Sequence, residues 1–148
     1  NSKPSVNSTE GVLYAEIAAL ANDGNLRMIN INDGTQNNRV GLQYSSSNNV
    51  ITAAYDISGA GQATLNHTLS NVTSFNKIAF KYKVNDFTLY VNGAEVATDT
   101  SGSVLSANTL NNIDFEYGDN RFFFYGKVKG LAVYNEALTD AQLIELTS

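Results

Sequence analysis

Apolar and polar residues alternate along most of the chain, in short runs separated by residues that favour turns. This alternation is typical of strands that bury one face. The pattern predicts strands over residues 11–20, 26–31, 39–44 and 50–57. These runs end at Asn-Asp-Gly, "SSSNN" or "SGAG" segments, which suit tight turns between antiparallel strands. The spacing predicts an all-β sandwich or barrel.

The segment over residues 77–98 predicts a three-stranded meander. A two-residue turn at 85–86 would pair Phe80 with Val91, Tyr82 with Leu89 and Val84 with Phe87 on a buried face. A second turn at 92–93 would pair Leu89 with Val96 on the same face. The other face would then carry Lys83 opposite Thr88, Lys81 opposite Tyr90, and Tyr90 opposite Glu95. The meander is therefore predicted to present an outward tyrosine flanked by charges.

The last third of the chain predicts two more strands and a helix. Ile113, Phe115 and Tyr117 alternate with acidic residues, which indicates a strand with one polar face. A final strand over residues 122–134 changes phase, and a β-bulge near Gly130 would reconcile its two halves. In "LTDAQL", Thr139 and Gln142 can form a capping box, and Leu138 and Leu143 can form a hydrophobic staple. The short helix is marginal alone and is expected to dock through Leu143 and Leu146.

Composition narrows the possible functions. A chain of 148 residues fits one domain, and the absence of cysteine excludes disulfides, thiolate catalysis and cysteine-ligated zinc. A net charge of −5 repels a phosphate backbone, so nucleic acid is not expected as a partner. No apolar run approaches the roughly 18 residues that span a bilayer, so membrane insertion is not expected either. His67, the single histidine, lies among polar residues and is expected to be solvated rather than catalytic.

Two segments together resemble the concanavalin A-like superfamily, and in particular its laminin-G-like jelly-roll domains. They are "FTLYVNGAEV" and "FFYGKVKGLAVYNEALTDAQL", in the order and separation that this family shows. The whole chain also looks like domains of phage tail appendages and of secreted or surface proteins of bacteria. The resemblance implies a two-sheet antiparallel jelly-roll sandwich over residues 11–148, preceded by a polar segment or linker over residues 1–10.

The resemblance also implies a class of function, which is the recognition of a glycan or a protein by an accessory module. We therefore expect a non-catalytic module that binds carbohydrate, such as a cell-surface polysaccharide, on an extracellular, surface or virion-displayed protein. The chain has no tryptophan, so an aromatic platform for sugar must come from Tyr or Phe. The candidate binding residues are Tyr90, Lys81, Glu95, Lys83, Asp114 and Glu116.

Several alternatives stay open. Asp114, Glu116 and Asp119 are similar to the three carboxylates of laminarinase-type glycosidases, although the enzymes place theirs before the Asn-Gly hairpin. Some relatives bind calcium at the rim of the sandwich, and Asp23 and Asp33 are the candidate ligands here, but both also suit simple turns.

The lysines of residues 77–83, together with Lys127 and Lys129, would form a basic patch if their strands were neighbours. In the run "RFFFY", at least one ring must point outward, reach a sheet end or contact another subunit. A structural fibre-tip or assembly domain that forms homo-oligomers is therefore the main alternative function.

Overall fold

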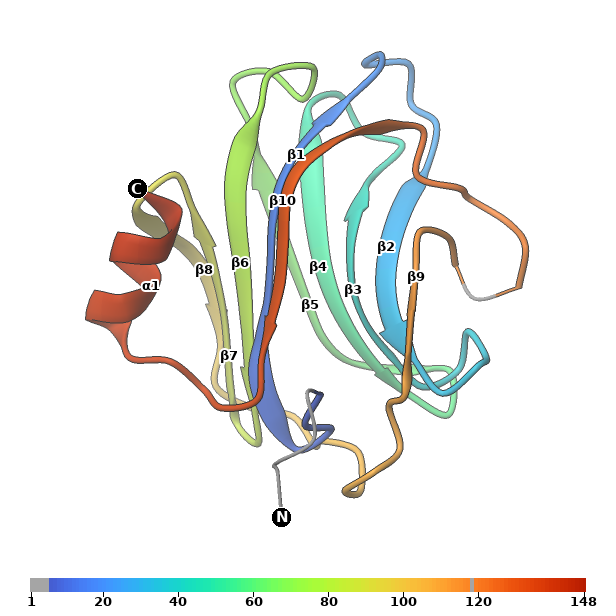
Figure 1. The fold of residues 1–148 in the computed structure, drawn as a ribbon, viewed down its shortest axis with the longest axis vertical. Helices are drawn as coiled ribbons and strands as arrows, with labels where there is room; N and C mark the ends of the chain where they lie inside the picture. The colour runs from blue at the N-terminus through green and yellow to red at the C-terminus, as the bar shows by residue number, and fades with distance from the viewer. Residues whose placement is uncertain (1–5, 118) are drawn as a thin grey trace.

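The computed structural model describes residues 6–117 and 119–148. Strands alternate with turns up to residue 134, and a short helix closes the chain (Figure 1). The elements are β1 (Glu10–Ala19), β2 (Arg27–Asn32), β3 (Arg39–Tyr44), β4 (Val50–Ile57), β5 (Ala60–Thr68), β6 (Asn76–Lys83), β7 (Asp86–Val91), β8 (Ala94–Asp99), β9 (Asn112–Asp114), β10 (Gly126–Tyr134) and α1 (Asp140–Thr147).

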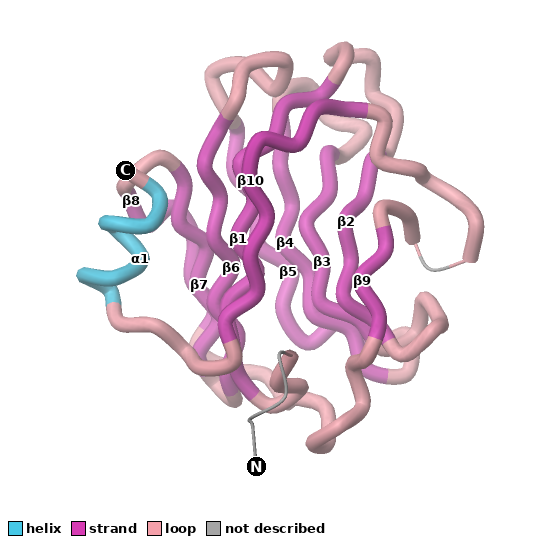
Figure 2. Tube along the Cα trace, in the orientation of Figure 1, coloured by secondary structure: helices cyan, strands magenta, loops and turns pink. Residues whose placement is uncertain are grey.

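Two antiparallel sheets of five strands each form the sandwich (Figure 2). The first sheet, called sheet A, has the strand order β10-β1-β6-β7-β8, and the second, sheet B, has the order β5-β4-β3-β2-β9. Alternate side chains of both sheets point into one shared core, as the period of two requires. The predicted all-β sandwich with one C-terminal helix is confirmed, and its arrangement is that of a jelly roll.

Aromatic rings occupy the middle of the core. The Tyr55 ring lies 5.5 Å from the Tyr82 ring and 5.6 Å from the Phe87 ring, between centroids. The Tyr55 hydroxyl donates to the Ser8 carbonyl oxygen at 2.6 Å and accepts from the Leu105 backbone nitrogen at 2.7 Å. This pairing allows a polar group to lie in an apolar interior without an unsatisfied donor.

The predicted register of the first hairpin in the meander is wrong by two residues. Lys83 pairs with Asp86, so the turn consists of Val84 and Asn85. Asn85 adopts φ 55°, a left-handed conformation that Asn tolerates well, and this places the turn one residue earlier than expected. Because the shift is even, the buried face is kept, but Tyr90 now opposes Ala79.

The second turn of the meander is confirmed, since Tyr90 pairs with Glu95. A bulge between Leu89 and Tyr90 shifts the remaining pairs, so Leu89 opposes Ala97 instead of the expected Val96. In β10 the predicted bulge is also present. Glu16 pairs with Gly130 and Ile17 with Val128, which leaves Lys129 as the extra residue.

Residues before β1 belong to the folded body, so the boundary predicted at residue 11 lies too late. Ser8 is buried, and its hydroxyl accepts from the backbone nitrogens of Thr109 and Leu110 at 3.0 and 2.9 Å. The Asn7 carbonyl oxygen accepts from the Tyr82 hydroxyl at 2.6 Å. Residues 1–5 of the expected linker lie outside the described residues.

Candidate functional site

Tyr90, the predicted outward platform, is buried and only 1% exposed. Helix α1 covers it, because Leu143 packs on the outer face of sheet A together with Tyr90, Ala79 and Val12. The Tyr90 hydroxyl donates to Asp140 Oδ1 at 3.0 Å. Burial is the largest cause that raises the pKa of Tyr90, and this hydrogen bond is the second. The exposure that we predicted for Tyr90 is therefore wrong, and its ring is unavailable to a sugar.

The charged neighbours of Tyr90 do not form a common site. Lys81 is 8% exposed and forms an ion pair with Asp86 at 2.9 Å. Glu95 lies directly opposite Tyr90 on β8 and is exposed, whereas Lys83 is exposed at the end of β6. The wider basic patch also fails to form, because β1 lies between β6 and β10 in the sheet. Lys129 lies 4.0 Å from Glu16 on β1, while Lys77 Nζ donates to the Ser148 carbonyl oxygen at 2.7 Å.

The three carboxylates near β9 are held separately. Strand β9 ends at Asp114, so Asp114, Glu116 and Asp119 do not follow one strand in the way that the glycosidase resemblance requires. Asp114 accepts from Asn32 Nδ2 at 2.7 Å, and Asp119 pairs with Arg121. Glu116 contributes its backbone carbonyl oxygen, which accepts from Asn30 Nδ2. These contacts give the Asp114 and Asp119 carboxylates structural roles, whereas the buried Glu116 Oε2 has no hydrogen-bond partner among the described residues.

The two candidate calcium ligands serve their own turns. Asp23 accepts from Arg27 at 2.9 Å and from Asn25, and the bond from Arg27 leads the causes that lower the pKa of Asp23. Asp33 accepts from Thr35 and Asn38, and these bonds outweigh the effect of burial and lower its pKa. Over residues 6–117 and 119–148, no group of three or more His, Cys, Asp or Glu side chains could hold a metal ion.

The outer face of sheet B carries polar and small side chains in three rows, and it is called the polar face below. Opposed residues across the strands share this face, as the strand registers require. The rows are Asn32, Arg39, Asp56 and Gly61; Asn30, Gly41, Ala54 and Thr64; and Met28, Gln43, Thr52 and Asn66.

Arg39 belongs to the first row of the polar face, its side chain reaches toward Gly41, and it is 5% exposed. Its guanidinium contacts Asp56 Oδ2 at 2.7 Å and donates to Asn30 Oδ1 at 2.9 Å. The Tyr117 ring lies over it, with the guanidinium carbon 4.9 Å from the ring centroid. A Cβ atom at position 41 would collide with the Asn30 and Arg39 side chains, so glycine there allows both to keep these contacts. Polar contacts and close packing thus fix the orientation of Arg39.

One nitrogen of Arg39 keeps the capacity for a further partner. Nη2 reaches Gln43 Oε1 at 3.5 Å, the long limit for a hydrogen bond. Beside it, the Thr52 hydroxyl donates to Asn66 Oδ1 at 2.6 Å, and Thr64 and Asn66 are exposed along β5. A planar guanidinium held in this way suits a carboxylate, while the amides and hydroxyls suit the hydroxyl groups of a sugar.

None of the polar-face residues was among our sequence candidates. The signal was present in the alternation. Asn30 and Asn32 stand two positions apart, and Arg39 and Gln43, like Thr52 and Asp56, stand four apart, so each pair shares one face of its strand. Register was needed to bring them together, because the strand order places β2, β3 and β4 side by side.

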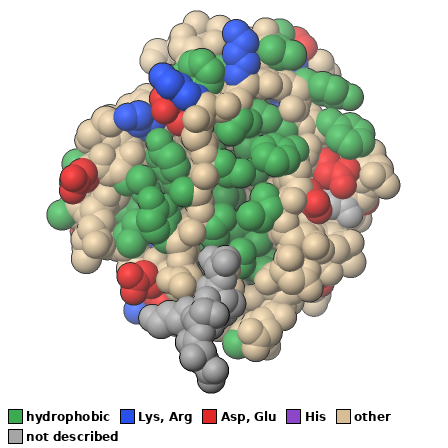
Figure 3. All heavy atoms as spheres, viewed as in Figure 1, with side chains coloured by type: hydrophobic (Ala, Val, Ile, Leu, Met, Phe, Trp, Pro, Cys, Tyr) green, Lys and Arg blue, Asp and Glu red, His purple; other side chains and the backbone are tan. Residues whose placement is uncertain are grey.

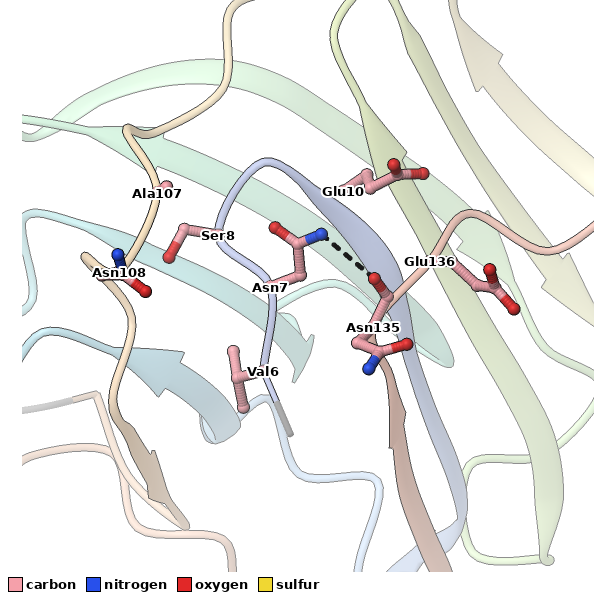
Figure 4. Close-up of a pocket in the computed structure, with 8 residues that line it drawn as sticks. All are labelled: Val6, Asn7, Ser8, Glu10, Ala107, Asn108, Asn135 and Glu136. Carbon is pink, nitrogen blue, oxygen red and sulfur yellow. Dashed lines mark hydrogen bonds between the residues drawn. The ribbon is translucent and has the colours of Figure 1, made fainter. Parts of the chain in front are cut away.

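A separate pocket of about 390 Å³ lies where the chain enters β1 (Figure 4). Asn7 comes from the entering segment, Glu10 begins β1, and Asn135 and Glu136 belong to the segment after β10. Asn7 Nδ2 donates to the Asn135 carbonyl oxygen at 3.1 Å, and Glu10 accepts from the Ala137 backbone nitrogen at 3.0 Å. These bonds anchor the ends of β1 and β10, so we assign the pocket a structural role.

The fold defines a jelly-roll β-sandwich, and sequence comparison identifies its superfamily. The sequence model of the concanavalin A-like lectin/glucanases superfamily matches residues 13–144. The chain belongs to this superfamily, which confirms the resemblance inferred from the two C-terminal segments. No curated protein matches the chain in a sequence search. No helix of the described residues is long and apolar enough to cross a membrane.

Solved structures of similar fold include parts of sialidases. The CBM40 of an IT-sialidase from Ruminococcus gnavus, bound to α2,3-sialyllactose, is similar with a TM-score of 0.75 and 18% identity, over 95% of this chain and 83% of that one. A leech intramolecular trans-sialidase is similar with a TM-score of 0.73 and 21% identity, over 95% of this chain and 23% of that one. The NanB sialidase of Streptococcus pneumoniae is similar with a TM-score of 0.73 and 18% identity, over 97% of this chain and 25% of that one. The chain thus spans about a quarter of the two whole enzymes.

Proposed function

We propose that this chain is a non-catalytic carbohydrate-binding module that recognises an acidic sugar on the polar face of sheet B. The observation that carries the proposal is Arg39, a guanidinium held in place by Asp56 and Asn30 on a sheet face rich in hydrogen-bonding side chains. The superfamily and the similarity to a module bound to sialyllactose support it.

The physical argument rests on the orientation of Arg39. A carboxylate accepts two parallel N–H bonds from a guanidinium, and such charge-assisted pairs are about twice as strong as neutral hydrogen bonds. Binding normally costs side-chain entropy, but contacts with Asp56, Asn30 and Tyr117 already restrict this side chain. The guanidinium is therefore already oriented, and because Arg39 is 5% exposed with the Tyr117 ring over it, a sugar carboxylate would have to reach it at Nη2, beside Gln43.

Calorimetric titration with 3′-sialyllactose and with lactose tests the proposal. We expect the wild-type chain to bind sialyllactose more tightly than lactose, because only the former carries a carboxylate. Arg39→Gln should weaken sialyllactose binding by about tenfold or more, the loss of a charged hydrogen bond of roughly 1.5–3 kcal/mol.

Two further variants act as controls for that titration. Lys83→Gln removes an exposed cation from sheet A and should leave binding unchanged. Arg39→Lys retains a charge opposite Asp56, so it separates loss of the planar fork from loss of folding. Equal affinity of the wild-type chain for both sugars would contradict the proposal.

We further propose that the parent protein is secreted, displayed at a cell surface or carried on a virion, where glycans are accessible. The support is the proposed ligand class alone. Fractionation of the source cells, followed by detection with an antibody against the chain, tests this setting. Recovery only from the cytosol would contradict it.

Assembly into homo-oligomers is the second candidate function, and one observation favours it. Two apolar side chains at the β9 edge are exposed, Ile113 by 43% and Phe115 by 44%, and Val128 at the β10 edge is 42% exposed. Ile113 is exposed although it lies on the inner face of sheet B. Hydrophobic side chains gather in the opening between these two strand edges (Figure 3). A contiguous apolar surface of this kind is typical of interaction sites.

A further inference from the structure

Three aromatic residues before β10 line a pocket at the end of the sandwich where the 22–25 and 45–49 loops lie. The pocket has a volume of about 550 Å³ and is lined by Gly24, Asn25, Leu26, Ser46, Phe122, Phe123 and Tyr125. This volume falls in the range of small-molecule sites. Arg39 and its partners are not among the lining residues, so the pocket is separate from the polar face.

Two of the aromatic rings are open to solvent. Phe123 is 42% and Tyr125 61% exposed, and their ring centroids lie 6.2 Å apart at an angle of 55°. Phe124, between them, points the other way and stacks on Tyr44 at 6.0 Å. In the run "RFFFY", Phe124 therefore packs against the core while Phe123 and Tyr125 are exposed, because successive side chains of an extended segment point to opposite sides.

The backbone that carries these rings is held in an unusual conformation. Phe122 has φ 55°, which is rare for a bulky residue and costs of the order of 1–3 kcal/mol. Its carbonyl oxygen accepts from the Met28 backbone nitrogen at 3.2 Å, and Arg121 lies over its ring at 5.2 Å. The hydrogen bond to Met28 of β2 thus helps to fix the segment that orients Phe123 and Tyr125.

Polar groups without partners border the rings. Asn25 Nδ2 donates to Asp23 Oδ2 at 2.8 Å, which fixes the amide plane and leaves Oδ1 as an acceptor. Among the described residues, neither Asn25 Oδ1 nor the Ser46 hydroxyl has a hydrogen-bond partner, and both residues are exposed. The pocket therefore combines exposed ring faces with a fixed amide and a free hydroxyl.

We propose that this pocket is a second sugar site, which takes a neutral pyranose unit. The apolar C–H face of the sugar lies on Tyr125 and Phe123, and sugar hydroxyls donate to Asn25 and exchange hydrogen bonds with Ser46. Aromatic rings bind such faces through apolar contact, and the neighbouring polar atoms satisfy the hydroxyls. No charged side chain lines the pocket, which favours a neutral ligand. The site does not depend on the polar face.

Nuclear magnetic resonance of the isotope-labelled chain, titrated with lactose, cellobiose and maltose, tests this site. We expect at least one of these neutral probes to shift the amide signals of Asn25, Ser46 and Tyr125 while that of Arg39 stays in place. Tyr125→Ala should weaken the response by about tenfold, the loss of one stacked ring. Tyr125→Phe keeps the ring and should keep the response.

Matched controls separate this site from the polar face and from self-association. Phe75→Ala removes another ring, 44% exposed, that does not line the pocket and should change nothing. Arg39→Gln should leave the response to neutral probes intact, so failure of one site is distinguishable from failure of the other. The proposal is overturned if none of the three probes shifts these signals, if Tyr125→Ala leaves the response unchanged, or if the shifts follow protein concentration instead of sugar.

Discussion

At the scale of single residues, tyrosine hydroxyls carry much of the polar bonding inside the sandwich. Tyr55 and Tyr82 hold the carbonyl oxygens of Ser8 and Asn7, so they join the entering segment to the core. Burial raises the pKa of Tyr55 to about 12 against the lowering effect of its bond with Leu105, and burial also raises the pKa of Tyr82. These residues favour the folded state only while they are protonated.

We expect alkaline unfolding as a result. An unfolded tyrosine loses its proton near pH 10, whereas folded Tyr55 keeps it until about 12. Its contribution to stability is therefore complete below pH about 10 and is lost as pH rises through about 12. Tyrosinate absorbance and circular dichroism, followed together, should show the last tyrosines ionising as the fold is lost.

Tyr55→Phe provides the comparison for the alkaline titration. The variant leaves the Leu105 N–H and the Ser8 carbonyl without this partner, so it should be less stable at neutral pH by about 1–3 kcal/mol. Its stability should then decline less steeply with pH than that of the wild-type chain. Complete ionisation of all tyrosines near pH 10 in a still folded protein would contradict the argument.

At the scale of elements, helix α1 closes the outer face of sheet A. The predicted capping box is present, with Thr139 Oγ1 accepting from the Gln142 backbone nitrogen at 3.2 Å and the Gln142 side chain accepting from the Thr139 backbone nitrogen. Leu143 is fully buried over Tyr90 and Ala79, as the docking prediction required. An eight-residue helix depends on such packing for its stability.

Leu143→Ala should therefore lower the free energy of unfolding by about 2–5 kcal/mol, and Thr139→Ala by about 1 kcal/mol. Ile144, on the next position, is 45% exposed, so Ile144→Ala should change it by less than about 0.5 kcal/mol. Urea titrations followed by circular dichroism give these values. Equal effects at positions 143 and 144 would show that the helix does not dock in this way.

Strands, the β10 bulge and the capping box were accessible from the sequence because each has a local cause. Alternation, turn residues and the Thr139–Gln142 spacing act within a few positions of the chain. Tyr90 shows the limit of this reasoning. The prediction placed it on the outer face correctly, but α1, about 50 residues later, covers that face, and no local pattern specifies where a helix docks.

The polar face was missed for a related reason. Its residues come from strands β2, β3 and β4, and only the pairing of those strands places Asn30 and Asp56 around Arg39. Asp114 and Glu116 are charged and close in sequence, but the fold pairs the Asp114 carboxylate with Asn32 and uses the backbone carbonyl of Glu116 to hold Asn30.

At the scale of the whole molecule, the sandwich is sealed unevenly. Helix α1 covers part of sheet A, whereas the opening between β9 and β10 displays Ile113, Phe115 and Val128. The edges of both strands that face this opening lack a neighbouring strand among the described residues. Apolar side chains beside free strand edges are a known route to association.

If assembly is a function of the chain, light scattering after size-exclusion chromatography should show an oligomer whose share rises with protein concentration. Ile113→Ser with Val128→Ser should shift it to monomer, since both are exposed apolar residues on the edge strands β9 and β10. The matched control is Val84→Ser, because Val84 is 51% exposed at a hairpin turn elsewhere. A wild-type chain that stays monomeric at high concentration would exclude this function.

The position of β1 has a consequence for how the chain reaches this structure. β1 is the first strand, yet one of its two neighbours is β10, which lies more than 100 residues further along. Contacts between distant segments form late, because a long loop must close before they stabilise anything. During synthesis, sheet A therefore stays incomplete until β10 has emerged from the ribosome, so this sheet can form in full only after residues 126–134 are available.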